Sequence, residues 1–256
     1  MWIDSHAHLS DLDDVQLASC IAAARENGVD RIVNVATSLL SNTTVLLQSG
    51  LHPCLSAAVG ISPFDTAEDL RPQGLYAQLA GFAEKKATVA IGETGMDNTN
   101  PVYPPLALQC EFFETHLCLA KAVDLPVIVH SRGCERQALD MCRAAGVRRA
   151  VFHCYTGPLD TLKRIIDAGY VVSFSGMITF KKSPFSPLVA YTPLLHMLIE
   201  TDSPYLAPVP HRGSQNQPAW VMYVGKAIAA IKNLDEEECG RRLEETFSRV
   251  FGKIIS

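Results

Sequence analysis

Eight short apolar segments, separated by longer amphipathic stretches, constrain the fold of this chain more than any other feature of its sequence. Such segments are typical of strands buried on both faces, and their alternation with helical patterns predicts parallel βα units. The expected strands are residues 2–5, 31–35, 57–61, 88–92, 126–129, 149–152, 169–173 and 197–201. Eight βα units are the number that closes a barrel, so the sequence predicts the α/β class and a single (β/α)8 TIM barrel.

Amphipathic helical patterns lie between several of the expected strands. The clearest patterns cover residues 14–27, 106–123 and 137–145. Gly28 and Gly146 follow two of these patterns, as expected for residues that end a helix. Residues 183–218 are rich in proline and polar side chains and are expected to form loops over one face, apart from the strand they contain, whereas residues 219–251 are expected to be helical.

Length and composition limit the class of protein. A chain of 256 residues suits one domain, residues 1–256, because barrels of this size have a single core. Hydrophobic residues make up 48% of the chain and charged residues 19%, which excludes intrinsic disorder. The net charge of -5 excludes a protein that holds nucleic acid through a broad basic surface. Any affinity for phosphate must be local, and bound divalent cations supply such local positive charge.

The sequence carries no sign of a membrane or secretory destination. No stretch of about 18 or more uninterrupted apolar residues is present, and the first residues lack a basic region followed by an apolar one. The eight cysteines are scattered without a CxxC pair, as expected for reduced thiols. We therefore expect a cytoplasmic protein without membrane contact, and no obligate protein partner is evident.

Two histidines, His6 and His8, stand at the end of the first expected strand. Alternate residues of an extended chain face the same side, so both imidazoles can reach one metal ion. An isolated pair with this spacing is as often two surface histidines beside a turn. The presence of further potential ligands at the same end of the barrel distinguishes a metal site from two surface histidines.

Four further potential ligands follow expected strands: Glu93, His130, His153 and Asp202. Each alone is as often a hydrogen-bonded barrel residue. In a barrel, however, the carboxyl ends of the strands converge on one mouth, where active sites are built. Six histidine and carboxylate ligands exceed the need of one tetrahedral zinc ion, so we expect two divalent ions that share a carboxylate.

The sequence resembles the TatD-like metal-dependent hydrolases, a branch of the amidohydrolase superfamily of TIM barrels, from end to end. The motifs that carry the resemblance are DSHAHL at 4–9, IGETGMD at 91–97, VIVHSR at 127–132, VFHCYTG at 151–157, SFSGMITFK at 173–181, ETDSPYL at 200–206 and PHRGSQNQP at 210–218. Their order and combination are far more specific than a lone HxH.

This resemblance implies a role for each ligand. His6 and His8 would bind one metal, His130 and His153 the other, and Glu93 would bridge them. Asp202 would complete the first site and handle the proton of the attacking water, which makes Asp202 and Glu93 the expected catalytic residues.

Members of this family are usually described as DNases, several of them 3′-5′ exonucleases, which use magnesium or another divalent metal. We therefore expect DNA as substrate and phosphodiester hydrolysis by a hydroxide that two metal ions activate. Ligation by several histidines favours zinc, manganese or a similar ion over magnesium, which prefers oxygen ligands. The sequence leaves the identity of the metal open.

Three positions depart from the family pattern. Ser62 stands where many members have histidine, Asn98 replaces the usual tyrosine after the glutamate motif, and Gln217 replaces a glutamate. These changes spare the six expected ligands. They put substrate preference and rate in question more than metal binding.

Several residues in the motif loops are candidate substrate contacts. Arg132, Lys181 and Arg212 are candidates for holding flanking phosphates, although each is as often an ordinary solvated charge. Tyr155 is a candidate for stacking on a base, and His211 for contacting substrate. Cys154 is expected to point away from the site, because it follows His153 in an extended segment.

Two other functions are compatible with the sequence. The same metal hydrolase would act on a small ester, lactone or amide, because fold and metals do not fix the substrate. Alternatively, the chain is a non-catalytic metal-binding barrel. The complete set of six ligands argues against the latter.

Overall fold

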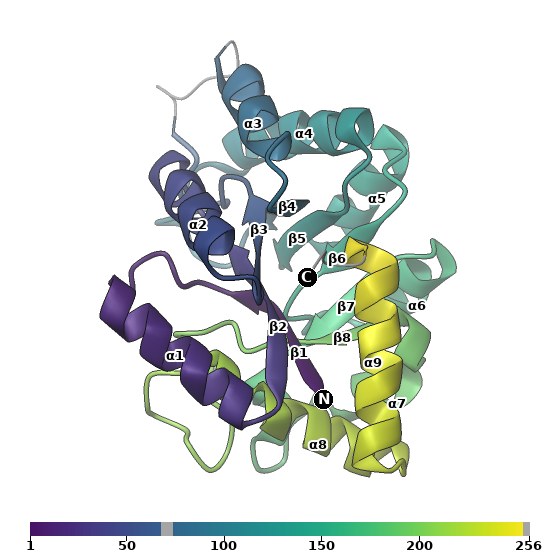
Figure 1. Cartoon of the computed structure of the whole chain (residues 1–256). Helices are drawn as coiled ribbons and strands as arrows, with labels where there is room; N and C mark the ends of the chain where they lie inside the picture. The colour runs from purple at the N-terminus through teal and green to yellow at the C-terminus, as the bar shows by residue number, and fades with distance from the viewer. Residues whose placement is uncertain (68–73, 253–256) are drawn as a thin grey trace.

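A computed structural model describes residues 1–67 and 74–252 of the chain. Eight parallel strands form one sheet in sequence order, each paired with the next (Figure 1). The strands are β1 (Trp2–Ala7), β2 (Val29–Val35), β3 (Leu55–Val59), β4 (Thr88–Asp97), β5 (Val127–Arg132), β6 (Ala150–Phe152), β7 (Val171–Phe174) and β8 (Met197–Ile199). The fold is therefore a single (β/α)8 TIM barrel, as predicted.

Helices connect the strands and surround the sheet (Figure 1). They are α1 (Asp14–Glu26), α2 (Leu39–Leu51), α3 (Leu75–Ala83), α4 (Leu106–Val123), α5 (Glu135–Ala145), α6 (Leu159–Asp167), α7 (Ser186–Tyr191), α8 (Val221–Lys232) and α9 (Glu236–Phe251). The short loop between α8 and α9 begins at Asn233, which adopts a left-handed conformation. Both helices pack beside β1 (Figure 1). Of the described helices, none is long and apolar enough to cross a bilayer.

The segment 183–218 differs in part from the expectation that it forms only loops around a strand. It contains β8, the short helix α7 and one 3₁₀ turn, Leu194–His196. Leu188 and Val189 of α7 are buried, and this apolar pair explains why the segment folds back as a helix despite its prolines. Proline within its first turn is compatible with a helix, because the first amide groups need no partner there.

Closure of the barrel joins β1 to the segment after β8. The backbone amide of Asp202 donates a hydrogen bond to the carbonyl of His6 at 2.9 Å, and that of His8 donates to Ser203 at 2.8 Å. The buried carboxylate of Asp4 accepts hydrogen bonds from the amide of Thr201 at 2.9 Å and that of His6 at 3.2 Å. Burial raises the pKa of Asp4 to about 8, despite these hydrogen bonds. These contacts bring the ends of the first and last strands together at the mouth of the barrel.

Candidate metal centre

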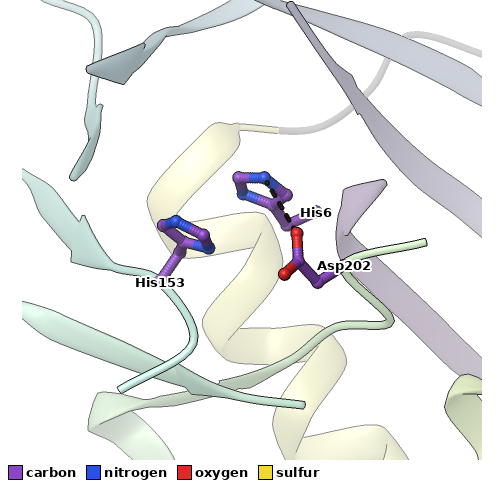
Figure 2. A group of neighbouring side chains, drawn as sticks. All are labelled: His6, His153 and Asp202. Atoms are coloured by element: carbon purple, nitrogen blue, oxygen red, sulfur yellow. Dashed lines mark ion pairs between the residues drawn. The ribbon is translucent and has the colours of Figure 1, made fainter. Parts of the chain in front are cut away.

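The six predicted ligands meet at one end of the barrel. His6, Glu93 and His130 lie within β1, β4 and β5, whereas the other three follow strand ends: His8, His153 and Asp202. Figure 2 shows how His6, His153 and Asp202 approach one another from separate parts of the chain. His6 is fully buried, and the remaining five ligands line a cavity of about 580 Å³ that opens to solvent.

One group of ligand atoms surrounds the histidine pair of β1. The Nε2 atoms of His6 and His8 are 3.1 Å apart. The Oε2 atom of Glu93 lies 3.5 Å from each of these two nitrogens. The Oδ1 atom of Asp202 lies 3.8 Å from Nε2 of His6 and 3.5 Å from Nε2 of His8. Glu93 and Asp202 therefore each lie near both histidine nitrogens. The groups of potential metal ligands join Glu93 with His6 and His8, and Asp202 with His6 and His153.

A second group faces the other oxygen of Glu93. Its Oε1 atom lies 2.9 Å from Nδ1 of His130 and 3.1 Å from Nε2 of His153, and these two nitrogens are 3.1 Å apart. The rings of His6 and His153 stack with centroids 4.1 Å apart and link the two groups. Each oxygen of Glu93 thus faces a different pair of histidines, which is the arrangement that a carboxylate shared by two cations requires.

The chemistry of this donor set fits divalent cations. Burial would raise the pKa of Glu93, but the charge of His153 and hydrogen bonds from His130 and His153 hold it well below its usual range. Burial would likewise raise the pKa of Asp202, but His8 and the charges of His6 and His153 lower it. The buried carboxylate of Glu93 and the partly buried carboxylate of Asp202 therefore stay ionised and need positive partners. Imidazole and carboxylate ligands in this number match zinc, manganese and similar ions.

The histidines are oriented by contacts on their far sides. Nδ1 of His8 lies 3.0 Å from the carbonyl oxygen of Val35. Nε2 of His130 lies 3.0 Å from Oδ2 of Asp97, and Nδ1 of His153 lies 3.5 Å from Oε1 of Glu200. At His8 and His130, these hydrogen-bond partners fix which ring nitrogen carries the proton and leave the opposite nitrogen free to bind metal.

Asp97 is the best anchored of these outer partners. Its Oδ1 atom accepts hydrogen bonds from the amide of Thr99 at 2.9 Å and from the Thr99 hydroxyl at 2.5 Å. Its backbone amide donates to Oε1 of the buried Gln109 at 2.7 Å. This role of Asp97 was not predicted from the sequence, although Asp97 follows Glu93 at an even spacing, which in an extended segment places both on one side.

We expect Asp97→Asn to weaken metal binding by about 10- to 100-fold, because the amide loses the charge that supports His130 while keeping the shape of the side chain. Isothermal titration of the metal-free protein with Mn²⁺ measures this change. Asp140→Asn, on the exposed face of α5, is the matched control and should bind as the wild type does. Equal metal affinity of Asp97→Asn and the wild type would show that His130 needs no carboxylate behind it.

Metal binding should displace protons from the cluster. Burial would lower the pKa of His8, but its hydrogen bond with Asp202 and the charge of Glu93 raise it from 6.5 to about 9. His8 of the metal-free protein therefore carries a proton below pH 9, and that proton must leave before the ring binds metal. We expect metal affinity to rise with pH between 6.5 and 9, with proton release detected by calorimetry in buffers of different ionisation enthalpy. A flat pH profile without proton release would contradict the assignment of His8 as a ligand.

Unusual backbone conformations occur beside the ligands. Asp202 has a φ of 53° and Cys154 a φ of 47°, which non-glycine residues adopt only where surrounding contacts hold them. The left-handed conformation of Cys154 ends the side-chain alternation of β6, which stops at Phe152. Cys154 therefore lines the cavity instead of pointing away from it. Gly95 has a φ of 134°, and a Cβ atom there would collide with the carbonyl oxygen of His130, so this position requires glycine.

The candidate substrate contacts lie in different surroundings. Arg132 lines the cavity, with a guanidinium nitrogen 4.0 Å from the sulfur of Cys154. Tyr155 is 3% exposed, and its hydroxyl donates to the carbonyl of Pro158. The ring of His211 stacks on Trp220 with centroids 4.0 Å apart. These roles stay predictions.

The other two cationic candidates lie on the surface. Lys181 is exposed, and the guanidinium of Arg212 lies 4.4 Å from the ring centroid of Phe180. Among the described residues that line the cavity, Arg132 is the only arginine or lysine. The roles of Lys181 and Arg212 as phosphate contacts stay predictions as well.

The departures from the family pattern fall around the same mouth. Ser62 is buried in the cavity wall, and its hydroxyl donates to Oδ2 of Asp65 at 2.9 Å. Asn98 is exposed at the end of β4, where its amide donates to the carbonyl of Arg132. Gln217 lines a neighbouring groove that shares His8 with the cavity. None of the three contributes to the groups of potential metal ligands in the described residues.

Comparison with known proteins assigns the chain to a family. A model of the family described as TatD related DNase matches residues 3–252. The uncharacterized metal-dependent hydrolase YcfH of Escherichia coli (strain K12) is 35% identical, covering 97% of this chain and 95% of its own length. The corresponding hydrolase YabD of Bacillus subtilis (strain 168) is 33% identical over 98% of this chain and 99% of its own. The crystal structure of YJJV, a TatD homolog from E. coli K12, superposes with a TM-score of 0.90 at 26% identity, covering 98% of this chain and 97% of that one. The chain belongs to the TatD related DNase family and is a metal-dependent hydrolase.

Proposed function

We propose that this protein hydrolyses phosphodiester bonds of DNA with two divalent metal ions, and that it removes nucleotides from the 3′ end of a strand. The observation that carries the proposal is the position of Glu93, whose two oxygens face separate pairs of histidines. His6, His8 and Asp202 would hold one ion together with Glu93, and His130 and His153 would hold the other.

The ions, when bound, would supply Lewis acidity that lowers the pKa of a water molecule toward about 7 and offsets charge on the phosphoryl oxygens. The residues of the chain then position the reactants and accept the proton of the attacking water. Asp202 has a lowered pKa, so it is ionised at neutral pH and can accept a proton as a general base. Arg132 stands in the cavity wall and can hold a phosphate oxygen through its planar guanidinium.

The description of the matching family as DNases supports DNA as the substrate. The acidic total charge does not oppose it, because the cations at the cluster would supply local positive charge. We expect the protein, stripped of metal and reloaded with Mn²⁺, Mg²⁺ or Zn²⁺, to shorten single-stranded DNA stepwise from its 3′ end. Oligonucleotides labelled at either end, resolved by length, test both the activity and its polarity.

A second candidate function is hydrolysis of a small molecule, because the cavity wall also carries Asp11 and Asp65. These two carboxylates would repel flanking phosphates and suit a small ester, lactone or amide instead. Intact oligonucleotides combined with hydrolysis of a small ester would favour this second function. Stepwise cleavage of DNA, with the small esters untouched, would support the first.

A further inference from the structure

Two exposed aromatic side chains stand in the wall of the metal cavity. Phe64 is 40% exposed and Tyr205 is 62% exposed, and both line the cavity. Large apolar side chains exposed singly on a surface need no explanation, but two that gather at one functional cavity do. We name these two residues the aromatic pair.

The two rings of the aromatic pair contact different histidines of the metal centre. The ring of Tyr205 approaches His8 edge to face, with centroids 6.4 Å apart. The ring of Phe64 approaches His130 edge to face, with centroids 5.0 Å apart. Because His8 and His130 face different oxygens of Glu93, one ring stands beside each group of metal ligands.

Both rings are carried by backbone that hydrogen bonds hold in place. The amide of Tyr205 donates to the carbonyl of Asp202, and its carbonyl accepts a hydrogen bond from the side chain of the buried Asn216 at 2.6 Å. The turn that carries Phe64 is fixed by Ser62, whose amide donates to the carbonyl of Thr37 at 2.8 Å. Rigid aromatic rings lose little conformational entropy when a ligand packs against them.

We propose that the aromatic pair stacks on the two bases that flank the scissile phosphate of single-stranded DNA. This inference rests on the proposed function. The cavity suits binding through bases, because Arg132 is the only arginine or lysine among its described lining residues. Stacking on aromatic rings holds single strands with little dependence on base identity, because every base has a planar face.

The test measures whether removing a ring and removing a base lower kcat/KM through the same contact or independently of each other. Products first locate the bond that the wild type cuts in a thymidine hexamer, and two further hexamers carry an abasic residue on either side of that bond. The variants are Tyr205→Leu and Phe64→Leu, which remove the planar ring but keep apolar volume. Tyr205→Phe keeps the ring, and Tyr191→Ala removes an aromatic side chain that is 46% exposed on α7. Metal content is measured for each variant.

With full metal content, each leucine variant should lose about tenfold or more in kcat/KM on the hexamer, mainly through KM, since one stacked base contributes that much. On the hexamer that lacks the base contacted by the missing ring, each leucine variant should have the same kcat/KM as the wild type has on that hexamer. Tyr205→Phe keeps the ring and should recover most of the kcat/KM that Tyr205→Leu loses, whereas Tyr191→Ala should match the wild type.

Unchanged kcat/KM in both leucine variants, or equal losses on intact and abasic hexamers, would overturn the role of the aromatic pair while leaving DNA hydrolysis intact. A leucine variant that loses metal and recovers wild-type kcat/KM when metal is restored would overturn it too. If the metal-loaded wild type cuts none of the oligonucleotides, the proposed function itself fails, and the stacking role falls with it.

Discussion

The Glu93→Gln variant should lose both metal binding and hydrolysis almost completely. Glutamine preserves the shape of the side chain but removes the negative charge that faces four histidines, at distances of 2.9 to 3.5 Å. Removing one partner from a buried ionic cluster costs about 3 to 5 kcal/mol, which corresponds to a loss of roughly a few hundred- to several thousand-fold in affinity. Metal content after dialysis and hydrolysis at saturating Mn²⁺ measure the two effects.

Two further variants test whether the loss depends on a negative charge at the position of Glu93. Glu93→Asp retains the charge on a shorter side chain, so it should recover part of the metal binding. Glu84→Gln, at the end of α3, changes the same chemical group on the surface and should behave as the wild type. Glu93→Gln that holds two ions and retains activity would show that the cluster does not need a shared carboxylate.

The Asp202→Asn variant should lower kcat by about 10²- to 10⁴-fold, because a positioned proton acceptor contributes this much to hydrolysis. Its carboxylate has a lowered pKa and lies 3.5 Å from His8, so the wild-type side chain is ionised beside the ligands. The group formed by His130, His153 and Glu93 does not include Asp202 and should keep its ion. Turnover at saturating metal, measured together with metal stoichiometry, separates lost proton transfer from lost metal.

For Asp202→Asn the matched control is Asp167→Asn at the end of α6. Its activity should stay within a factor of a few of the wild type, as for most surface substitutions. If Asp202→Asn turned over as fast as this control, Asp202 would have no part in proton transfer.

The fold could be predicted from the sequence because its strands are short apolar runs that alternate with amphipathic helical patterns. Each of the eight expected strands overlaps an observed one, although β4 and β5 run further than expected, to Asp97 and Arg132. The extensions escaped prediction because polar residues and glycines interrupt the apolar pattern at the point where the strands reach the site. Helix α7 escaped prediction because only tertiary packing of its apolar residues compensates for its proline, Pro187.

The meeting of the six ligands also followed from the sequence, since strand ends in a barrel converge. What the sequence could not supply was the direction of individual side chains beyond those ends. Tyr155, a candidate for stacking on a base, is 3% exposed, whereas Tyr205 and Phe64 stand exposed in the cavity. Cys154 faces the cavity because of a left-handed turn that no alternation rule anticipates.

The outer partners of the histidines were missed for a similar reason. Asp97 and Glu200 both lie in recognised motifs, but a motif does not state which of its acids touches metal and which supports a ligand. That distinction depends on distances of a few ångströms, set by the register between strands. Here β4 and β5 pair Gly95 with His130 and Asp97 with Arg132, which brings the Asp97 carboxylate to the far side of the His130 ring.

The most direct test of the account is the anomalous diffraction of crystals grown from Mn²⁺-loaded protein. Two peaks are expected, one among His6, His8, Glu93 and Asp202 and the other among Glu93, His130 and His153. A single peak, or peaks away from Glu93, would contradict the claim that this carboxylate joins two cations.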